Sequence, residues 1–285
     1  MGNRLYGNGI VFFCRAYNDI DHITPIIYKM KQTQPDTEIE LIVYDIKKTY
    51  FNDFRISYLD SIGVRIFHIL DLISVNKSLS HFYLNEYRKR NKSGYSRIRR
   101  ILSNRLLIRI EKYFSKIIKS LSGEQFIKDN FINLPKVILF DQSYDRFYIN
   151  IASASKKLGI KTIAVPHGHN ILDNELIWDK SMEIYPEKAN RLNDKVSMTK
   201  MSFDFVVFEN YRISERYIRF GIVDEQQATV LGSSRFSDEW IKKLREIIPL
   251  NQPNFKEDAL KVVIMLSKPT YNGFTDELIR SIEYI

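Results

Sequence analysis

The sequence predicts an α/β fold in which buried parallel strands alternate with helices. Short apolar runs without polar alternation, such as 9–14 and 137–140, are typical of strands buried on both faces. Segments with apolar residues at helical spacing separate these runs, and parallel strands need such crossovers. The segment 136–170 shows the pattern most clearly, because a strand, a helix and a second strand follow one another and end in Pro-His-Gly-His-Asn.

The first third of the chain supports this prediction element by element. A helix begins within residues 18–21, where Asn and Asp side chains offer N-caps, and ends near Gln34. The strand–helix–strand–helix–strand series indicates right-handed crossovers. Segment 76–94 is polar and irregular in pattern. The expected strands are 9–14, 39–44 and 64–69, and the expected helices are 18–34 and 49–61.

The middle of the chain continues the alternation. Asp145 can cap a helix that Gly159 ends at its C′ position. Segment 171–201 has weak periodicity and is long for a loop, so we expect it to contain structure or to serve a function. The expected strands are 137–140, 161–165, 205–208 and 228–231, and the expected helices are 96–121, 145–158, 214–220 and 237–248.

The sequence divides into an N-terminal domain, a linker and the start of a second domain. Residues 1–249 hold the alternating elements, whereas 250–259 is polar and contains Pro253. Residues 260–285 contain one strand, 260–266, and a helix from Thr275. One strand and one helix cannot close a core, so we expect the sequence to be truncated.

The formal charge of +9 is concentrated in one segment. Residues 88–119 contain twelve Lys or Arg and one acid, Glu111, so the rest of the chain is slightly acidic. Within this segment the helix 96–121 is amphipathic and carries a basic stripe. The stripe is either a solvated face of a packed helix, a surface for anionic lipid or a phosphate-bearing substrate, or a nucleic-acid surface. We expect an anionic membrane surface and no nucleic acid as the partner.

Cysteine content and hydropathy indicate the compartment. Cys14 is the only cysteine, which excludes a disulfide framework and a cysteine-rich metal site and suggests a reducing compartment. No apolar stretch reaches the roughly 18 residues of a membrane-spanning helix, and no signal-peptide core is evident. We predict a cytoplasmic protein that is peripheral at the inner face of the cell membrane.

His167, His169 and Asp141 are the candidate catalytic residues. His167 follows a buried strand and stands between Pro166, which fixes the approach of the chain, and Gly168, which allows close contact with a ligand. An imidazole at a strand end can act as a general base near neutral pH. The alternative is that the histidine only shapes the turn, and Asp141 either orients a base or caps the next helix. No third ligand is suggested by spacing, so we expect no metal.

A second group of residues is suited to substrate or donor binding. The segment Gly232-Ser233-Ser234-Arg235 lies between a strand and a helix, where amides, hydroxyls and a guanidinium can hold phosphate. The alternative is a helix cap with a surface arginine. Ser267-Lys268 has the same placement in the second domain. Glu209, at a strand end, can orient a histidine or hold a ribose or sugar hydroxyl, and the alternative is that it caps the following helix. Gly168 and Asn170 flank the candidate bases. The chain has no G-x-G-x-x-G, Walker or G-x-S-x-G motif.

Four segments resemble a known architecture. They are Ala164-Val-Pro-His-Gly-His-Asn170, Asp204-Phe-Val-Val-Phe-Glu209, Thr229-Val-Leu-Gly-Ser-Ser-Arg-Phe236 and Lys261-Val-Val-Ile-Met-Leu-Ser-Lys-Pro269. The set looks like the GT-B architecture, in which two Rossmann-like domains face one another across a cleft. It is similar to bacterial surface-polysaccharide glycosyltransferases and CDP-glycerol glycerophosphotransferases. Segment 231–236 also resembles UDP-N-acetylglucosamine 2-epimerases.

The resemblance implies a Rossmann-like, acceptor-side domain in residues 1–249 and a donor domain that begins at 260. His167 would be the base of the His-Gly motif, and Lys268 would contact the donor. The implied function is metal-independent transfer of a sugar from a nucleotide-sugar donor to a surface polysaccharide, such as a capsule, or to a lipid-linked glycan, with no other cofactor. Polyol-phosphate transfer from CDP-glycerol or CDP-ribitol, epimerisation, and a non-enzymatic nucleic-acid-binding role are the alternatives.

Overall fold

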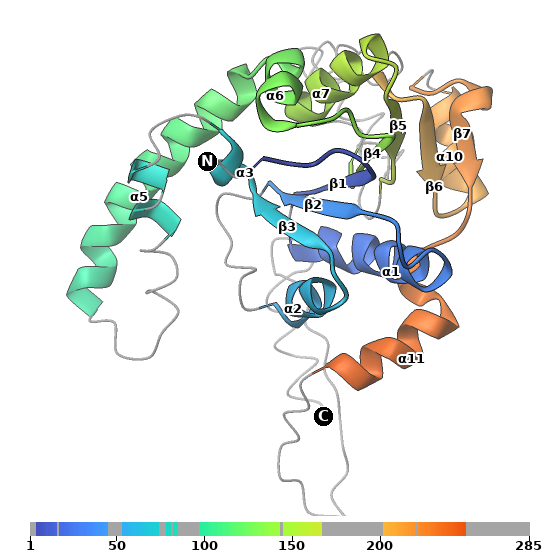
Figure 1. Ribbon diagram of the computed structural model, residues 1–285, viewed down its shortest axis with the longest axis horizontal. Helices are drawn as coiled ribbons and strands as arrows, with labels where there is room; N and C mark the ends of the chain where they lie inside the picture. The colour runs from blue at the N-terminus through green and yellow to red at the C-terminus, as the bar shows by residue number, and fades with distance from the viewer. Residues whose placement is uncertain are drawn as a thin grey trace, which may run out of the picture. The chain divides into compact units, whose positions relative to one another are not determined.

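A seven-stranded parallel sheet forms the centre of the protein (Figure 1). The computed structural model describes residues 4–15, 17–44, 53–73, 78–80, 82–84, 97–142, 145–166, 202–219 and 222–248. The strand order is β3-β2-β1-β4-β5-β6-β7, and every neighbouring pair is parallel. The α/β class with a Rossmann-like parallel sheet is therefore confirmed. The strands are β1 (Ile10–Cys14), β2 (Ile39–Val43), β3 (Arg65–His68), β4 (Val137–Phe140), β5 (Lys161–Ala164), β6 (Phe205–Phe208) and β7 (Ala228–Val230).

The helices lie between these strands as the sequence predicts, with a few differences. The α-helices are α1 (Tyr17–Thr33), α2 (Phe54–Ser61), α3 (Ile69–Leu72), α5 (Arg97–Ser120), α6 (Gly123–Asn130), α7 (Arg146–Lys157), α10 (Tyr211–Arg219) and α11 (Asp238–Ile247). Two 3-10 turns, η2 (Glu225–Gln227) and η3 (Ser234–Phe236), flank β7. None of the helices in the described ranges is long and apolar enough to cross a membrane.

The strand order places a switch point between β1 and β4. The chain builds the sheet outward from β1 to β3, then returns to the other side of β1 and continues through β4 to β7. In such sheets the ligand crevice lies outside the carboxyl ends of the strands near the point of reversal. The carboxyl ends of β1, β4, β5 and β6 therefore share one edge of the sheet.

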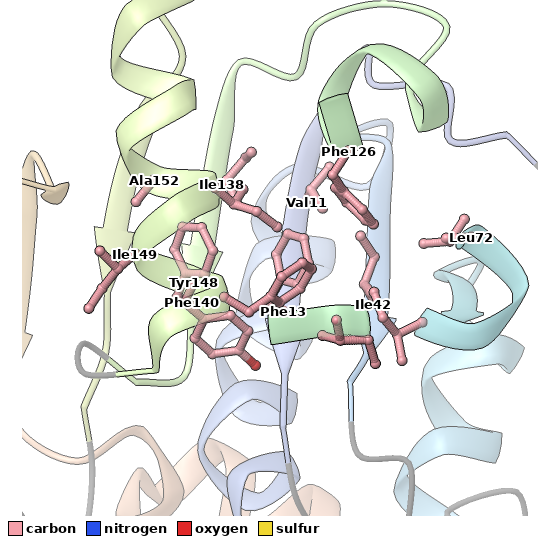
Figure 2. Close-up of a cluster of buried hydrophobic side chains, with 14 of the residues drawn as sticks. Val11, Phe13, Ile42, Leu72, Phe126, Ile138, Phe140, Tyr148, Ile149 and Ala152 are labelled. Atoms are coloured by element: carbon pink, nitrogen blue, oxygen red, sulfur yellow. The ribbon is translucent and has the colours of Figure 1, made fainter. Parts of the chain in front are cut away.

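One set of buried side chains fills each face of the sheet. On one face Phe12 and Leu41 from the strands pack with Ile23 and Ile27 of α1. On the other face Phe13 stacks on Phe140 with ring centroids 5.2 Å apart, and Phe126 and Tyr148 close around them (Figure 2). Both faces are therefore covered, which explains why the central strands read as unbroken apolar runs.

Several helices differ from the sequence-based expectation. α6 was not predicted, although Ser122 caps it by accepting the Gln125 amide hydrogen bond. Segments 78–80 and 82–84 are helical where an irregular segment was expected, because Tyr83 is buried against Phe114 of α5. α1 begins at Tyr17, so Asp19 lies in its first turn instead of preceding the helix.

The chain crosses back over the sheet after β7. Trp240 of α11 is buried and packs against Tyr28 of α1 and Tyr58 of α2, with ring centroids 5.6 and 6.3 Å away. Lys29 and Glu239 add an exposed ion pair at 2.8 Å. These contacts fasten α11 to the α1 face of the sheet and bring the loop after β7 against α1.

The predicted linker, 250–259, and second domain, 260–285, lie outside the described residues. Their boundaries, and the expectation of a Rossmann-like donor domain, stay predictions.

Candidate functional site

A pocket of about 360 Å³ opens at the carboxyl edge of the sheet on its α1 face. This volume falls at the lower end of the usual range for small-molecule sites, so it suits one sugar-sized group. Most of its wall is apolar, and a few polar groups converge on one side. The lining residues are His22, Ile26, Leu139, Ile163, Val165, Pro166, Val207, Glu209, Leu231, Gly232, Ser233, Ser234 and Ser237.

A histidine and a carboxylate meet in this pocket. His22 lies in the second turn of α1 and is only 5% exposed, and Glu209 is the first residue after β6. The His22 Nδ1 atom and the Glu209 Oε1 atom are 3.5 Å apart. A carboxylate at this position can fix the orientation of an imidazole and stabilise its protonated form. The pair therefore has the composition of a general base with its orienting acid.

The loop after β7 is tied to the backbone of His22. Pro25 lies inside α1 and has no N–H, so it cannot donate to the Asp21 carbonyl one turn earlier. Beside this interruption, the Ser234 hydroxyl donates to the His22 carbonyl oxygen at 2.8 Å. The bond joins residues that are 212 positions apart and holds the loop next to the imidazole.

Within that loop, Gly232 and Ser233 have features of a binding segment. Gly232 adopts a φ of +85°, a conformation that other residues rarely take, so a glycine is needed for the turn out of β7. The Ser233 hydroxyl is buried, lines the pocket and has no hydrogen-bond partner among the described residues. A buried hydroxyl of this kind is poised to bond a polar ligand atom.

The predicted phosphate site at Gly232–Arg235 is only partly realised. The sequence places its amides at the start of a helix, but η3 intervenes and α11 begins at Asp238. Arg235 is exposed, its guanidinium carbon lies 4.8 Å above the Phe236 ring, and it does not line the pocket. Ser234 is hydrogen-bonded to α1, so residues 234–236 turn the chain in η3 before α11 starts.

Asp141 lies beneath the edge and away from the pocket lining. It follows β4, is fully buried, and accepts the Arg15 amide at 3.0 Å across the switch point. Burial and the nearby Asp19 carboxylate raise the pKa of Asp141 well above its usual value. We therefore infer a structural role for Asp141, in which its side chain links the ends of β1 and β4.

Two aspartates in α1 have the D-x-D spacing that can bind a metal ion, but they face different partners. Asp21 pairs with the buried Arg55, which Asp53 also holds. Asp19 is buried, and its Oδ2 atom lies 3.7 Å from Nε of Arg15. Among the described residues no group of three or more His, Cys, Asp or Glu has the geometry of a metal site.

The remaining predicted site residues lie outside the described residues. They are His167, Gly168, His169, Asn170, Ser267 and Lys268. Pro166, which lines the pocket, directly precedes His167 in the sequence. Thus the structure brings together Glu209, Gly232, Ser233 and Ser234 and adds His22, which sequence reasoning missed.

No family model and no curated protein matches the sequence. Among solved structures, the chain is similar to the UDP-N-acetylglucosamine 2-epimerase of Rickettsia bellii, with 13% identity and a TM-score of 0.43 over 85% of this chain and 48% of that one. It is also similar to the glycotransferase of kitacinnamycin, with 10% identity and a TM-score of 0.41 over 80% of this chain and 52% of that one.

A third similar structure is Arabidopsis thaliana UGT89C1 complexed with quercetin, with 11% identity and a TM-score of 0.36 over 85% of this chain and 56% of that one. The chain thus spans about half the length of the solved structures it matches. The fold assignment itself rests on the strand order and parallel pairing of the sheet.

Proposed function

We propose that the chain is the acceptor-side part of a GT-B-type glycosyltransferase. In this proposal it transfers a sugar from a nucleotide-sugar donor to a hydroxyl of a surface polysaccharide or lipid-linked glycan. The observation that carries the proposal is the His22–Glu209 pair, which lies in a sugar-sized pocket at the carboxyl edge of a doubly wound sheet. A base beside a small pocket at this edge suits the activation of an acceptor hydroxyl.

In the proposed reaction His22 takes the proton of the acceptor hydroxyl. The acceptor oxygen then forms a bond to the anomeric carbon of the donor sugar while the bond from that carbon to the diphosphate oxygen breaks. The Glu209 carboxylate stabilises the resulting imidazolium, and the nucleoside diphosphate leaves with the electron pair. The Ser233 hydroxyl would hold a sugar oxygen in the pocket. No metal ion enters this scheme.

His167 is the second candidate for the base. Its support is the sequence, where it follows Pro166 at the end of β5, and Pro166 lines the same pocket. His169, on the other side of Gly168 in the sequence, is a third candidate. Separate replacement of His22 and His167 by alanine distinguishes the two, because removal of a general base lowers the rate by about 10² to 10⁴.

The decisive assay measures nucleotide release from UDP-, GDP-, CMP- and CDP-linked donors by the full-length protein, with and without glycan acceptors. The proposal predicts acceptor-dependent release from a nucleotide sugar. Acceptor-dependent release from CDP-glycerol or CDP-ribitol alone would establish polyol-phosphate transfer instead. Conversion of UDP-N-acetylglucosamine without any acceptor would establish epimerisation. No turnover with any donor, under conditions where the protein is folded, would contradict an enzymatic role.

A lipid-linked acceptor would place this reaction at the inner face of the cell membrane. The predicted cytoplasmic, peripheral location follows from that acceptor and is part of the proposal.

A further inference from the structure

We infer that α5 docks the protein on an anionic lipid bilayer through one defined side of the helix. We call this side the outer face of α5 and define it by Leu106, Ile108, Arg109, Lys112, Tyr113 and Lys116. The inference is independent of the proposed enzymatic function, because it rests on the exposure and charge of this helix alone.

The structure separates α5 into an inner and an outer side. Leu107, Ile110, Phe114 and Ile118, spaced by three and four residues, are at most 6% exposed and belong to the core. Packing of this side alone would explain an amphipathic helix whose other side is polar. However, three large apolar residues of the outer face are about half exposed: Leu106 at 48%, Ile108 at 49% and Tyr113 at 46%. The inner side therefore does not account for all the apolar residues of the helix.

The cations of the outer face form a continuous stripe. Arg109, Lys112 and Lys116 follow one another at steps of three and four, so they lie above one another on one side of the helix. All three are exposed, and none is in an ion pair with the described residues, whereas the exposed Lys128 of α6 pairs with Glu124. Unpaired cations in a row provide charge complementarity to a surface of anionic head groups.

The apolar residues flank this stripe. At 100° per residue, Leu106 and Tyr113 fall on one flank of the cations and Ile108 falls on the other. Transfer of aliphatic side chains from water to the boundary between head groups and acyl chains lowers their free energy. A tyrosine ring also suits that boundary. A nucleic-acid backbone offers no such apolar medium to a leucine or isoleucine. The combination of cations with exposed aliphatic residues therefore favours a bilayer over RNA or DNA.

The position of α5 is compatible with docking while the pocket is in use. The inner side of α5 packs in the same core as α6 and α7, on the face of the sheet opposite α1 (Figure 1). The pocket lies on the α1 face. Contact between the outer face of α5 and a bilayer therefore uses a different side of the sheet from ligand binding.

Vesicle co-sedimentation of the full chain tests this inference. The probes are vesicles of phosphatidylcholine alone and vesicles that also contain phosphatidylglycerol. We expect binding only to the second kind, with affinity that falls as salt is added. Each cation near the surface strengthens binding about fivefold, so Lys112→Gln with Lys116→Gln should weaken it roughly 25-fold. Leu106→Ser with Ile108→Ser should weaken it by about tenfold or more.

Two matched variants serve as controls. Lys242→Gln with Arg245→Gln removes the same charge from exposed positions of α11, and Ile132→Ser with Leu134→Ser removes similarly exposed aliphatic residues elsewhere. Neither pair of control residues has a role in docking. The apolar control should therefore bind vesicles like the unchanged protein, and the charge control should lose far less affinity than the α5 charge variant. Circular dichroism establishes that all variants are folded.

Three outcomes would overturn the inference. The first is an absence of binding to anionic vesicles by the folded protein. The second is an equal loss of binding in the α5 variants and their controls, which would indicate unspecific attraction. The third is tight, salt-sensitive binding to RNA that persists in the Leu106→Ser, Ile108→Ser variant while vesicles are not bound, which would assign the outer face to nucleic acid.

Discussion

Replacement of Asp141 by asparagine should change how the stability of the protein depends on pH. Asp141 is fully buried at the switch point of the sheet, and its Oδ2 atom accepts the Arg15 amide hydrogen bond at 3.0 Å. Burial, and then the charge of nearby Asp19, raise the pKa of Asp141 well above 3.8. Because the folded state holds this proton more tightly than the unfolded chain, unfolding at intermediate pH releases it.

The sign and slope of the effect follow from this difference. The stabilising contribution of the protonated carboxyl is fully present below pH 3.8 and is lost as the pH rises through the folded-state pKa. Across that interval the free energy of unfolding should fall by about 1.4 kcal/mol per pH unit for this group. The amide oxygen of asparagine can accept the same Arg15 hydrogen bond and does not titrate. The free energy of unfolding of the variant should therefore increase relative to that of the unchanged protein as the pH rises.

Urea unfolding at a series of pH values measures this directly. We expect the difference in unfolding free energy between Asp141→Asn and the unchanged protein to increase in favour of the variant from acidic toward neutral pH. Asp60→Asn, at an exposed position of α2, is the control and should give a parallel curve. If the difference in unfolding free energy between Asp141→Asn and the unchanged protein were constant over the whole pH range, it would contradict a raised pKa of the buried Asp141.

Three further predictions concern the site, the packing of α11 and the contact between α6 and α7. Glu209→Gln should lower kcat by about 10- to 10³-fold while the protein stays folded, since the carboxylate orients His22. Unchanged kinetics would contradict a role of Glu209 in the reaction. Trp240→Ala should lower the free energy of unfolding, measured by urea denaturation, by about 3 to 5 kcal/mol, because the side chain is only 1% exposed. A loss below 1 kcal/mol would contradict the packing of α11 on α1. Gly123→Ala should destabilise more than Gly159→Ala, because a Cβ at Gly123 would overlap the Asn150 carbonyl group, whereas at Gly159 only the positive φ of +74° opposes alanine and no atom lies within 4 Å of the Cβ. Equal melting temperatures would contradict the close approach of α6 and α7.

The sequence predicted the sheet well because its strands are local patterns. Runs such as Val137–Phe140 and Phe205–Phe208 are bounded by polar or turn residues, and the structure gives the same limits. Asp145 caps α7 as expected, through its side chain and the amides of Phe147 and Tyr148. Each of these features depends on neighbours in the chain, so periodicity and capping rules suffice to find them.

The missed elements are short and depend on contacts with distant residues. α6 has only eight residues, too few for a clear period, although the Ser-x-x-Gln spacing at Ser122 could have indicated its start. The helical residues at 82–84 are held by burial of Tyr83 against α5. Tertiary packing, and not local propensity, determines these segments.

The candidate site could be predicted only in part for the same reason. Glu209, Gly232, Ser233 and Ser234 were predicted because they follow strands, where ligands bind in parallel sheets, and all four line the pocket. His22 was missed because it lies inside a helical pattern, and only the return of α11 to α1 brings the loop after β7 against it. Contacts between residues more than two hundred positions apart leave no trace in local sequence patterns.

The most direct test of the proposed function is the rate of sugar transfer by His22→Ala, compared with the unchanged full-length protein. Unfolding by urea establishes that the variant is folded, and donor binding measured by calorimetry separates catalysis from donor affinity. We expect kcat to be about 10² to 10⁴ lower, with the donor dissociation constant nearly unchanged. Transfer at the unchanged rate by folded His22→Ala would contradict the role of the His22–Glu209 pair as the base.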